Sequence, residues 1–294
     1  MPRNTTDFDK DLNPLLEIAS NKELDYLVDI IKGTWTGSLD KEDAYKEHAP
    51  NHGMYADLIA SHIRRFGGNT FSNLYRGLTD SGNASLIGPK YHEIVCDVAK
   101  HLKVNCNRKQ SVELVEQAIF AKLLTDTLEK MTDEQKMNFL ASVGVTNLTG
   151  STLTLTSAAI AVLKAGGRES LTMMNTMVAS ICKLLLGRGL PSAAGPTLTT
   201  ALKIMSGPVG VAVTALWAAV DVASPARRII VPVVLYVGML RAQYNSSVCA
   251  KCDRLLSPDD KFCPQCGSSQ KPLEHLAETP ASNRKNNNTK GAKK

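Results

Sequence analysis

Two cysteine pairs near the C-terminal end of the chain have the spacing of a metal site. Cys249 and Cys252 form one Cys-x-x-Cys pair, and Cys263 and Cys266 form a second pair after ten intervening residues. Each pair can place two thiolates on one tight turn, and two such turns together provide the tetrahedral sulfur set that zinc prefers. Four thiolates leave no coordination position for water or substrate. We therefore predict one structural Zn²⁺ ion rather than a catalytic one.

The residues around these cysteines are typical of a small zinc ribbon with two short strands. Pro264 and Gly267 flank the second pair, where a turn must direct backbone N–H groups toward sulfur, and Phe262 is placed to cover the metal. The alternative is a set of redox disulfides, but thioredoxin-like motifs of that kind lie in a strand-helix-strand pattern, which we do not find around these pairs. We assign residues 248–270 to the ribbon.

Other candidates for chemistry are weak. His92 and Cys96 lie four residues apart with Glu93 between them, as in the zinc-protease helix motif, but a cysteine replaces the second histidine and no third ligand is evident. We interpret them as a core cysteine beside a surface histidine. Cys96, Cys106 and Cys182 are scattered without disulfide spacing, which indicates a reducing compartment. We find no catalytic set and predict a protein that is not an enzyme, with no small-molecule substrate.

The elements that position the ribbon begin with an acidic helical part. Residues 1–150 hold 17 basic and 21 acidic residues, a net charge of −4. Ser20 and Glu23 form a capping box that opens a helix ending at Gly33, and Thr132 and Gln135 form a second one. Apolar residues recur at helical spacing, so we predict an all-α fold. A short helical element spans residues 1–33, and an amphipathic bundle spans residues 34–150.

A hydrophobic, basic region follows at residues 151–247. It holds 8 basic and 2 acidic residues, a net charge of +6. The stretch 204–220 has no charged residue, and neither has the stretch 229–240, which Pro232 interrupts. The segment between these stretches carries an acid, a proline and two arginines, so we predict a hydrophobic helical hairpin. Both stretches are shorter than the roughly 20 residues of a conventional membrane span.

The hairpin has two interpretations. It is either the buried centre of a helical domain, or a membrane-associated element whose basic side chains contact anionic lipid headgroups. The basic excess favours the second interpretation. The candidate headgroup contacts are Arg188, Lys203, Arg227, Arg228 and Arg241.

The C-terminal residues 271–294 are rich in Asn, Lys, Ser and Thr, and we predict a disordered basic tail. Nucleic-acid binding by ribbon and tail is one alternative, but the ribbon holds Asp253, Asp259 and Asp260 and a single aromatic residue. We therefore favour a protein partner for the ribbon.

The N-terminal stretch carries three Asp before any apolar run, unlike a secretory signal, so we expect a cytoplasmic location, free or at the inner membrane.

Several segments resemble a known family. They are FGGNTFSNLYRG at 66–77, VCDVAKHLKV at 95–104, LEKMTDEQKMNFL at 128–140 and GPVGVAVTALWAAVDVASPARRIIVPVVLYVGMLR at 207–241. Over residues 12–243 the chain resembles the bacterial YaaW-like proteins, whose helical middle is grouped with the ubiquinol–cytochrome c chaperone domain. The resemblance implies a helical fold and brings no catalytic residues, and the ribbon and tail lie beyond it.

Together these features predict a membrane-associated helical protein whose structural zinc ribbon recruits or senses a partner. The first alternative is a chaperone or adaptor with the hairpin buried. The second is a nucleic-acid-binding protein that uses ribbon and tail, with an affinity that falls steeply with salt.

Overall fold

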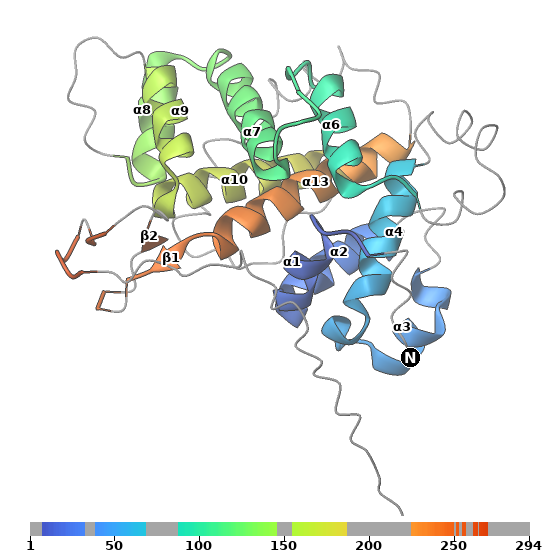
Figure 1. Ribbon diagram of the computed structural model, residues 1–294. Helices are drawn as coiled ribbons and strands as arrows, with labels where there is room; N and C mark the ends of the chain where they lie inside the picture. Colours follow the sequence, from blue (N-terminus) through green and yellow to red (C-terminus); the bar gives the residue numbers. More distant parts are fainter. Residues whose placement is uncertain are drawn as a thin grey trace, which may run out of the picture.

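The computed structural model describes residues 8–32, 39–68, 88–145, 155–186, 225–249, 251–252, 255–256, 261–263 and 265–269. Within these ranges the chain is mostly helical, which confirms the all-α prediction (Figure 1). Arg188, Lys203, Pro264, the stretch 204–220 and the tail 271–294 lie outside them, so the predictions for these residues stay predictions.

Short helices form the N-terminal part of the molecule. They are α1 (Asn13–Ile18), α2 (Asn21–Lys32), the 3-10 helix η1 (Leu39–Lys41), α3 (Asp43–His48), the 3-10 helix η2 (His52–Tyr55) and α4 (Ala56–Gly68). The predicted capping box precedes α2, where the Ser20 N–H donates to Glu23 Oε2 at 2.9 Å and the Glu23 N–H donates to Ser20 Oγ at 3.4 Å. One face of α2 is buried through Leu24, Leu27 and Ile31, as its helical spacing predicts.

Five further helices of the described ranges form the middle part. They are α6 (Tyr91–His101), α7 (Val112–Leu128), α8 (Asp133–Ser142), α9 (Leu155–Ala165) and α10 (Gly167–Leu186). The second predicted capping box opens α8: the Gln135 N–H donates to Thr132 Oγ1 at 3.3 Å, and the Thr132 N–H donates to Gln135 Oε1 at 3.0 Å. Gly144 follows α8 with a φ of 94°, a left-handed conformation that favours glycine at a helix end.

The helix α13 (Pro225–Tyr244) is the centre of the fold (Figure 1). It contacts α2 and α4 of the N-terminal part and α6, α7 and α10 of the middle part. Every residue from 230 to 240 is buried, and a helix that is apolar all round is the kind that forms a core. The second arm of the predicted hairpin is therefore buried in the bundle.

The expectation that Pro232 interrupts this arm is wrong. Pro232 lies inside α13, which continues through it for 20 residues. A proline removes one backbone donor, and close packing on all sides of α13 compensates for that loss. Among the helices of the described ranges, none is long and apolar enough to cross a bilayer.

A two-stranded antiparallel ribbon follows α13. β1 (Ser247–Val248) pairs with β2 (Leu255–Leu256), with Ser247 opposite Leu256 and Val248 opposite Leu255. A further antiparallel bridge joins Phe262 to Ser269, and β2 contacts α10. The ribbon is thus attached to the end of the central helix, at the edge of the molecule (Figure 1).

Candidate metal centre

The ribbon brings all four predicted cysteines to one point. Cys249 directly follows β1, Cys252 lies on the turn after it, and Cys263 follows the bridge residue Phe262. The Sγ atoms of Cys249 and Cys266 are 3.5 Å apart, and those of Cys252 and Cys263 are 3.6 Å apart. All four sulfurs lie within 4.8 Å of one another.

These distances fit a zinc ion. A tetrahedral ion with Zn–S bonds of about 2.3 Å places its sulfurs about 3.8 Å apart. Two of the separations, 3.5 Å and 3.6 Å, are close to that value, and none of the others exceeds 4.8 Å. No other set of three or more metal-binding side chains comes this close together in the described ranges.

The local backbone of the ribbon also suits thiolate ligands. The Lys251 N–H donates to Cys249 Sγ at 3.4 Å, and the Ser268 hydroxyl lies 3.1 Å from the sulfurs of both Cys249 and Cys266. The Ser268 hydrogen bond is the main cause that lowers the pKa of Cys249, to about 5, and it also lowers the pKa of Cys266. Gly267 turns the chain at a φ of 67°, which favours glycine.

Phe262 is not buried over the cysteines, contrary to the prediction. It is 63% exposed and is not part of the small core of the ribbon. That core consists of Cys249, Cys263 and Leu256, with Cys252 and Cys266 half-buried beside them. The bridge explains the difference, because successive residues of an extended strand face opposite sides and Cys263 takes the inner side.

Arg241 does not reach a lipid headgroup in this fold, which corrects the prediction for this residue. It is 9% exposed, and its Nε donates to Glu116 Oε2 at 2.8 Å. Its Nη2 donates to the carbonyl oxygen of Asp11 at 2.6 Å, and its guanidinium lies 5.8 Å from the ring centre of Tyr91. Arg227 and Arg228 lie on the first turn of α13, and their side chains are outside the described part.

Comparison with known proteins gives a family. A UPF0174 protein of Helicobacter pylori strain J99 is 32% identical over 240 residues, which cover 80% of this chain and 91% of the relative. The chain belongs to the UPF0174 family. A second UPF0174 protein of that strain is 31% identical over 207 residues, covering 69% of this chain and 95% of the relative. No family model and no solved structure matches the chain.

Family membership confirms the predicted likeness to YaaW. The UPF0174 protein YaaW of Escherichia coli K12 is 28% identical over 202 residues, which cover 68% of this chain and 76% of the relative. The grouping with the ubiquinol–cytochrome c chaperone domain is not part of these names and stays a prediction.

A buried charge cluster holds the centre of this UPF0174 bundle. Glu116 on α7 accepts hydrogen bonds from Arg241 and, at 2.9 Å, from the hydroxyl of Tyr91. Burial raises the pKa of Glu116 to about 6, because Arg241 and Tyr91 offset only part of the cost of desolvation. Gly238 lets α13 approach this site, since a Cβ there would lie 3.3 Å from the Glu116 side chain.

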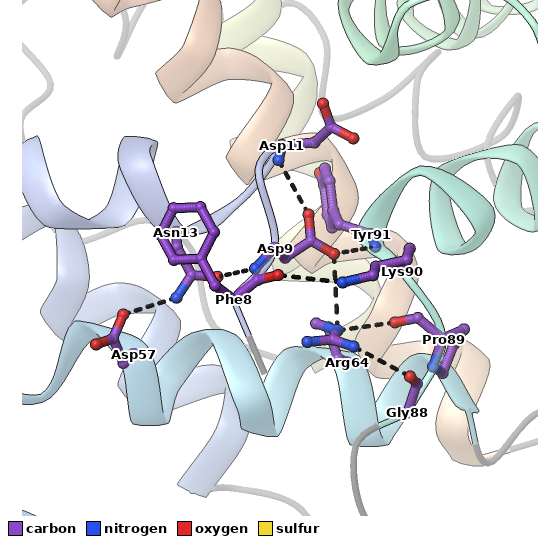
Figure 2. A network of polar contacts seen from close by, with 10 residues as sticks. All are labelled: Phe8, Asp9, Asp11, Asn13, Asp57, Arg64, Gly88, Pro89, Lys90 and Tyr91. Carbon is purple, nitrogen blue, oxygen red and sulfur yellow. Dashed lines mark hydrogen bonds and ion pairs between the residues drawn. The ribbon is translucent and has the colours of Figure 1, made fainter. Parts of the chain in front are cut away.

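A second polar network ties the N-terminal segment to α4 and α6 (Figure 2). The carboxylate of Asp9 accepts from the Tyr91 N–H at 2.7 Å and lies 3.6 Å from Arg64 Nε. Arg64 is itself buried and donates to the carbonyl oxygens of Pro89 at 2.9 Å and Gly88 at 3.2 Å. The N-terminal segment therefore connects this network to the charge cluster, because Arg241 donates to the carbonyl oxygen of Asp11.

A pocket of about 170 Å³ lies beside the charge cluster, between α7, α10 and α13. Its apolar wall includes Leu114, Phe120 and Met174, and Glu116 and Arg241 lie at its polar side. Ligand pockets commonly measure about 300 to 1,000 Å³, so this one is small. Glu116 and Arg241 pair with each other, and Glu113, the third charged residue of the lining, is exposed to solvent.

Proposed function

We propose that this UPF0174 chain is a non-enzymatic helical protein that binds a protein partner through a structural zinc ribbon. The observation that carries the proposal is the exposure of Phe262, which is 63% accessible while the neighbouring Cys263 faces inward. Aromatic side chains are enriched among the residues that anchor protein interfaces. A metal-braced backbone would present Phe262 on a rigid surface, which reduces the ordering cost of binding.

Zinc is the ion that the donor set supports best. Cys249, Cys252, Cys263 and Cys266 would hold one Zn²⁺ by four thiolates, a closed coordination that leaves no position for a reacting molecule. The ion would act by bracing the ribbon, because the buried part of this ribbon is too small to fold by apolar contacts alone.

The absence of catalysis is also a proposal, and two features of the described residues support it. Glu116 is the buried acid beside the pocket, and it is engaged by Arg241 and Tyr91. The thiols that could act as nucleophiles in the ribbon are those that would ligate the metal. In the proposed arrangement, hydrogen bonds hold the acid and the metal holds the thiols.

The position of α13 supports the adaptor alternative for the hydrophobic region. The stretch 229–240 packs inside the bundle, and Arg241 is part of the core. A membrane contact stays a proposal that rests on Arg188, Lys203, Arg227 and Arg228, whose side chains lie outside the described part. A cytoplasmic location and nucleic-acid binding by the tail 271–294 likewise stay predictions.

Photo-crosslinking in cells tests the proposed function. A photoreactive phenylalanine analogue replaces Phe262 in the full chain, and the same analogue replaces Met137, which is 50% exposed on α8, as the matched control. We expect a discrete crosslinked protein from position 262 only, and its loss when Cys263→Ser and Cys266→Ser are added. No protein crosslink at 262, or one that survives loss of the ligands, would contradict the proposal. Crosslinking to nucleic acid would instead support the alternative that the ribbon and the tail bind nucleic acid.

A further inference from the structure

Two cysteines outside the ribbon lie in direct contact. Cys96 is on α6 and Cys106 is on the loop that follows it, and their Sγ atoms are 2.6 Å apart. The prediction that these cysteines are scattered is therefore wrong. A disulfide bond is about 2.05 Å long, so the two sulfurs need to approach by only about 0.6 Å to reach that distance.

The end of α6 explains why these two residues meet. Lys103 has a φ of 57°, and the Val104 N–H donates to the carbonyl oxygen of Ala99 at 2.8 Å. This six-to-one bond is the Schellman pattern, which reverses the chain at a helix end. The following residues return along α6, and Cys106 comes to lie over Cys96.

His92 supplies a base for this pair. It lies one turn before Cys96, and its Nε2 is 2.7 Å from the carbonyl oxygen of Gln110. A carbonyl oxygen only accepts, so Nε2 carries the hydrogen and Nδ1 of the neutral ring is an acceptor. Nδ1 lies 3.9 Å from Cys96 Sγ, within reach of its S–H group. A hydrogen bond of 2.9 Å from the Gln110 N–H to Asn107 holds Gln110 in place.

The two thiols differ in their access to solvent. Cys96 is 1% exposed, and burial raises its pKa to about 12, so it stays protonated at neutral pH and requires a base to react. Cys106 is half-buried and is open to solvent from the loop. A small oxidant therefore meets Cys106 first.

We propose that Cys96 and Cys106 form a reversible disulfide by exchange with small-molecule disulfides, with His92 as the base for Cys96. The Cys106 thiolate attacks one sulfur of the small disulfide, forms a mixed disulfide and releases one small thiolate. Cys96 then transfers its proton to Nδ1 of His92 and attacks the Cys106 sulfur. The second small thiolate leaves, and the two released thiolates take up the protons lost by Cys106 and by His92. Two protein thiols are oxidised to one disulfide, and one small disulfide is reduced to two thiols.

The disulfide would fasten the loop after α6 to that helix. This loop carries Gln110 and leads directly into α7, which holds Glu116. Oxidation is therefore expected to slow hydrogen exchange at the N–H groups of Lys103 and Val104. The disulfide site does not involve the ribbon or its partner. The disulfide proposal can therefore fail or succeed independently of the proposed function.

The experiment uses the zinc-loaded full chain and oxidised glutathione, with peptide mass spectrometry at timed intervals. In the unchanged chain we expect a linked Cys96–Cys106 peptide that dithiothreitol reverses. In Cys96→Ser we expect glutathione to accumulate on Cys106, because the resolving thiol is missing. In Cys106→Ser we expect Cys96 to stay reduced, and Cys182→Ser serves as the control with no effect on the link.

The base assignment has its own test. His92→Gln should slow the conversion of the mixed disulfide to the linked peptide by roughly 100-fold while leaving the first step unchanged. Three results would overturn the proposal. They are a mixed disulfide that persists in the unchanged chain, Cys96 reacting at full rate in Cys106→Ser, and Cys106 linking to a ribbon cysteine instead. A conversion rate unaffected by His92→Gln would overturn the role of His92.

Discussion

The helical bundle and the cysteine ribbon are continuous at the end of α13, yet different interactions hold them together. In the bundle, α13 is buried from residue 230 to residue 240 and contacts helices from both halves of the chain. In the ribbon, the buried core is limited to Cys249, Leu256 and Cys263. The bundle can therefore fold by apolar packing, whereas the core of the ribbon is too small and the ribbon relies on its four thiols.

This difference shows how one chain joins a large scaffold to a small surface module. Small units cannot bury enough apolar area to offset the entropy of folding, and a metal ion is one established replacement. The charge pair of Glu116 and Arg241 belongs to the scaffold, where it joins α7 to α13. Perturbations of the ribbon should consequently leave the bundle intact. Perturbations of the bundle should likewise leave the ribbon intact.

Removal of metal should produce the largest effect, and it should be confined to the ribbon. Structural zinc sites contribute about 10–16 kcal/mol of folding free energy to small domains, so a strong chelator should unfold residues 247–269. We expect the N–H groups of Cys263 and Gly267, which now donate to backbone oxygens at 2.8 Å, to lose protection from hydrogen exchange. The N–H groups of α13 should keep theirs, and simultaneous loss in both regions would show that the bundle depends on the ribbon.

Breaking the buried ion pair should destabilise the bundle and leave the ribbon intact. Arg241→Leu leaves the carboxylate of Glu116 without its cation, and such a loss typically destabilises a protein by about 3–5 kcal/mol. Urea denaturation followed by circular dichroism measures this change. The double variant Glu116→Leu with Arg241→Leu should lose less than Arg241→Leu alone, because no buried charge is left unpaired. Zinc content should be unchanged in both variants, and its loss would show that the two regions depend on each other.

Gly88→Ala should destabilise the bundle by about 1–3 kcal/mol, the typical cost of a strained backbone. Gly88 has a φ of 73°, and a Cβ there would lie 2.6 Å from the backbone oxygen of Arg64. Gly53→Ala is the matched control, since its Cβ would make only an ordinary contact at 3.5 Å. Equal thermal unfolding midpoints for the two variants would contradict the role assigned to the Asp9–Arg64 network.

The smallest effect is expected at the capping box of α8. Thr132→Ala removes the side-chain acceptor for the Gln135 N–H and should lower the free energy of unfolding by about 1 kcal/mol. Ser111→Ala at the start of α7 is the control, because Ser111 makes no side-chain cap hydrogen bond. A loss of similar size in both variants would show that the helix caps do not act as described.

Features set by local sequence were predictable, and features set by distant contacts were not. The two capping boxes and the four ribbon cysteines depend on residues within a few positions of one another, and the structure contains them as predicted. Arg241 was assigned to lipid because its partner, Glu116, is 125 residues away in the sequence. The basic excess of the hydrophobic region gave no signal for that pairing.

Two further differences between the predictions and the structure have similar causes. Pro232 is a helix breaker by local rule, but packing on all sides of α13 keeps the helix continuous. Cys96 and Cys106 meet because the chain reverses at Lys103, a non-glycine residue with positive φ that sequence patterns do not announce. The signal in the sequence is the separation of ten positions, which fits the end of a helix followed by a segment that returns along it.

In the proposed arrangement, a metal ion holds the ribbon while the bundle folds without it. Native mass spectrometry of the full chain, purified without added metal, tests this most directly beside the variant Cys263→Ser with Cys266→Ser. We expect one zinc ion per unchanged chain, none in the variant, and the same helical circular dichroism in both. A chain without zinc, or a variant that keeps its zinc or loses its helices, would contradict it.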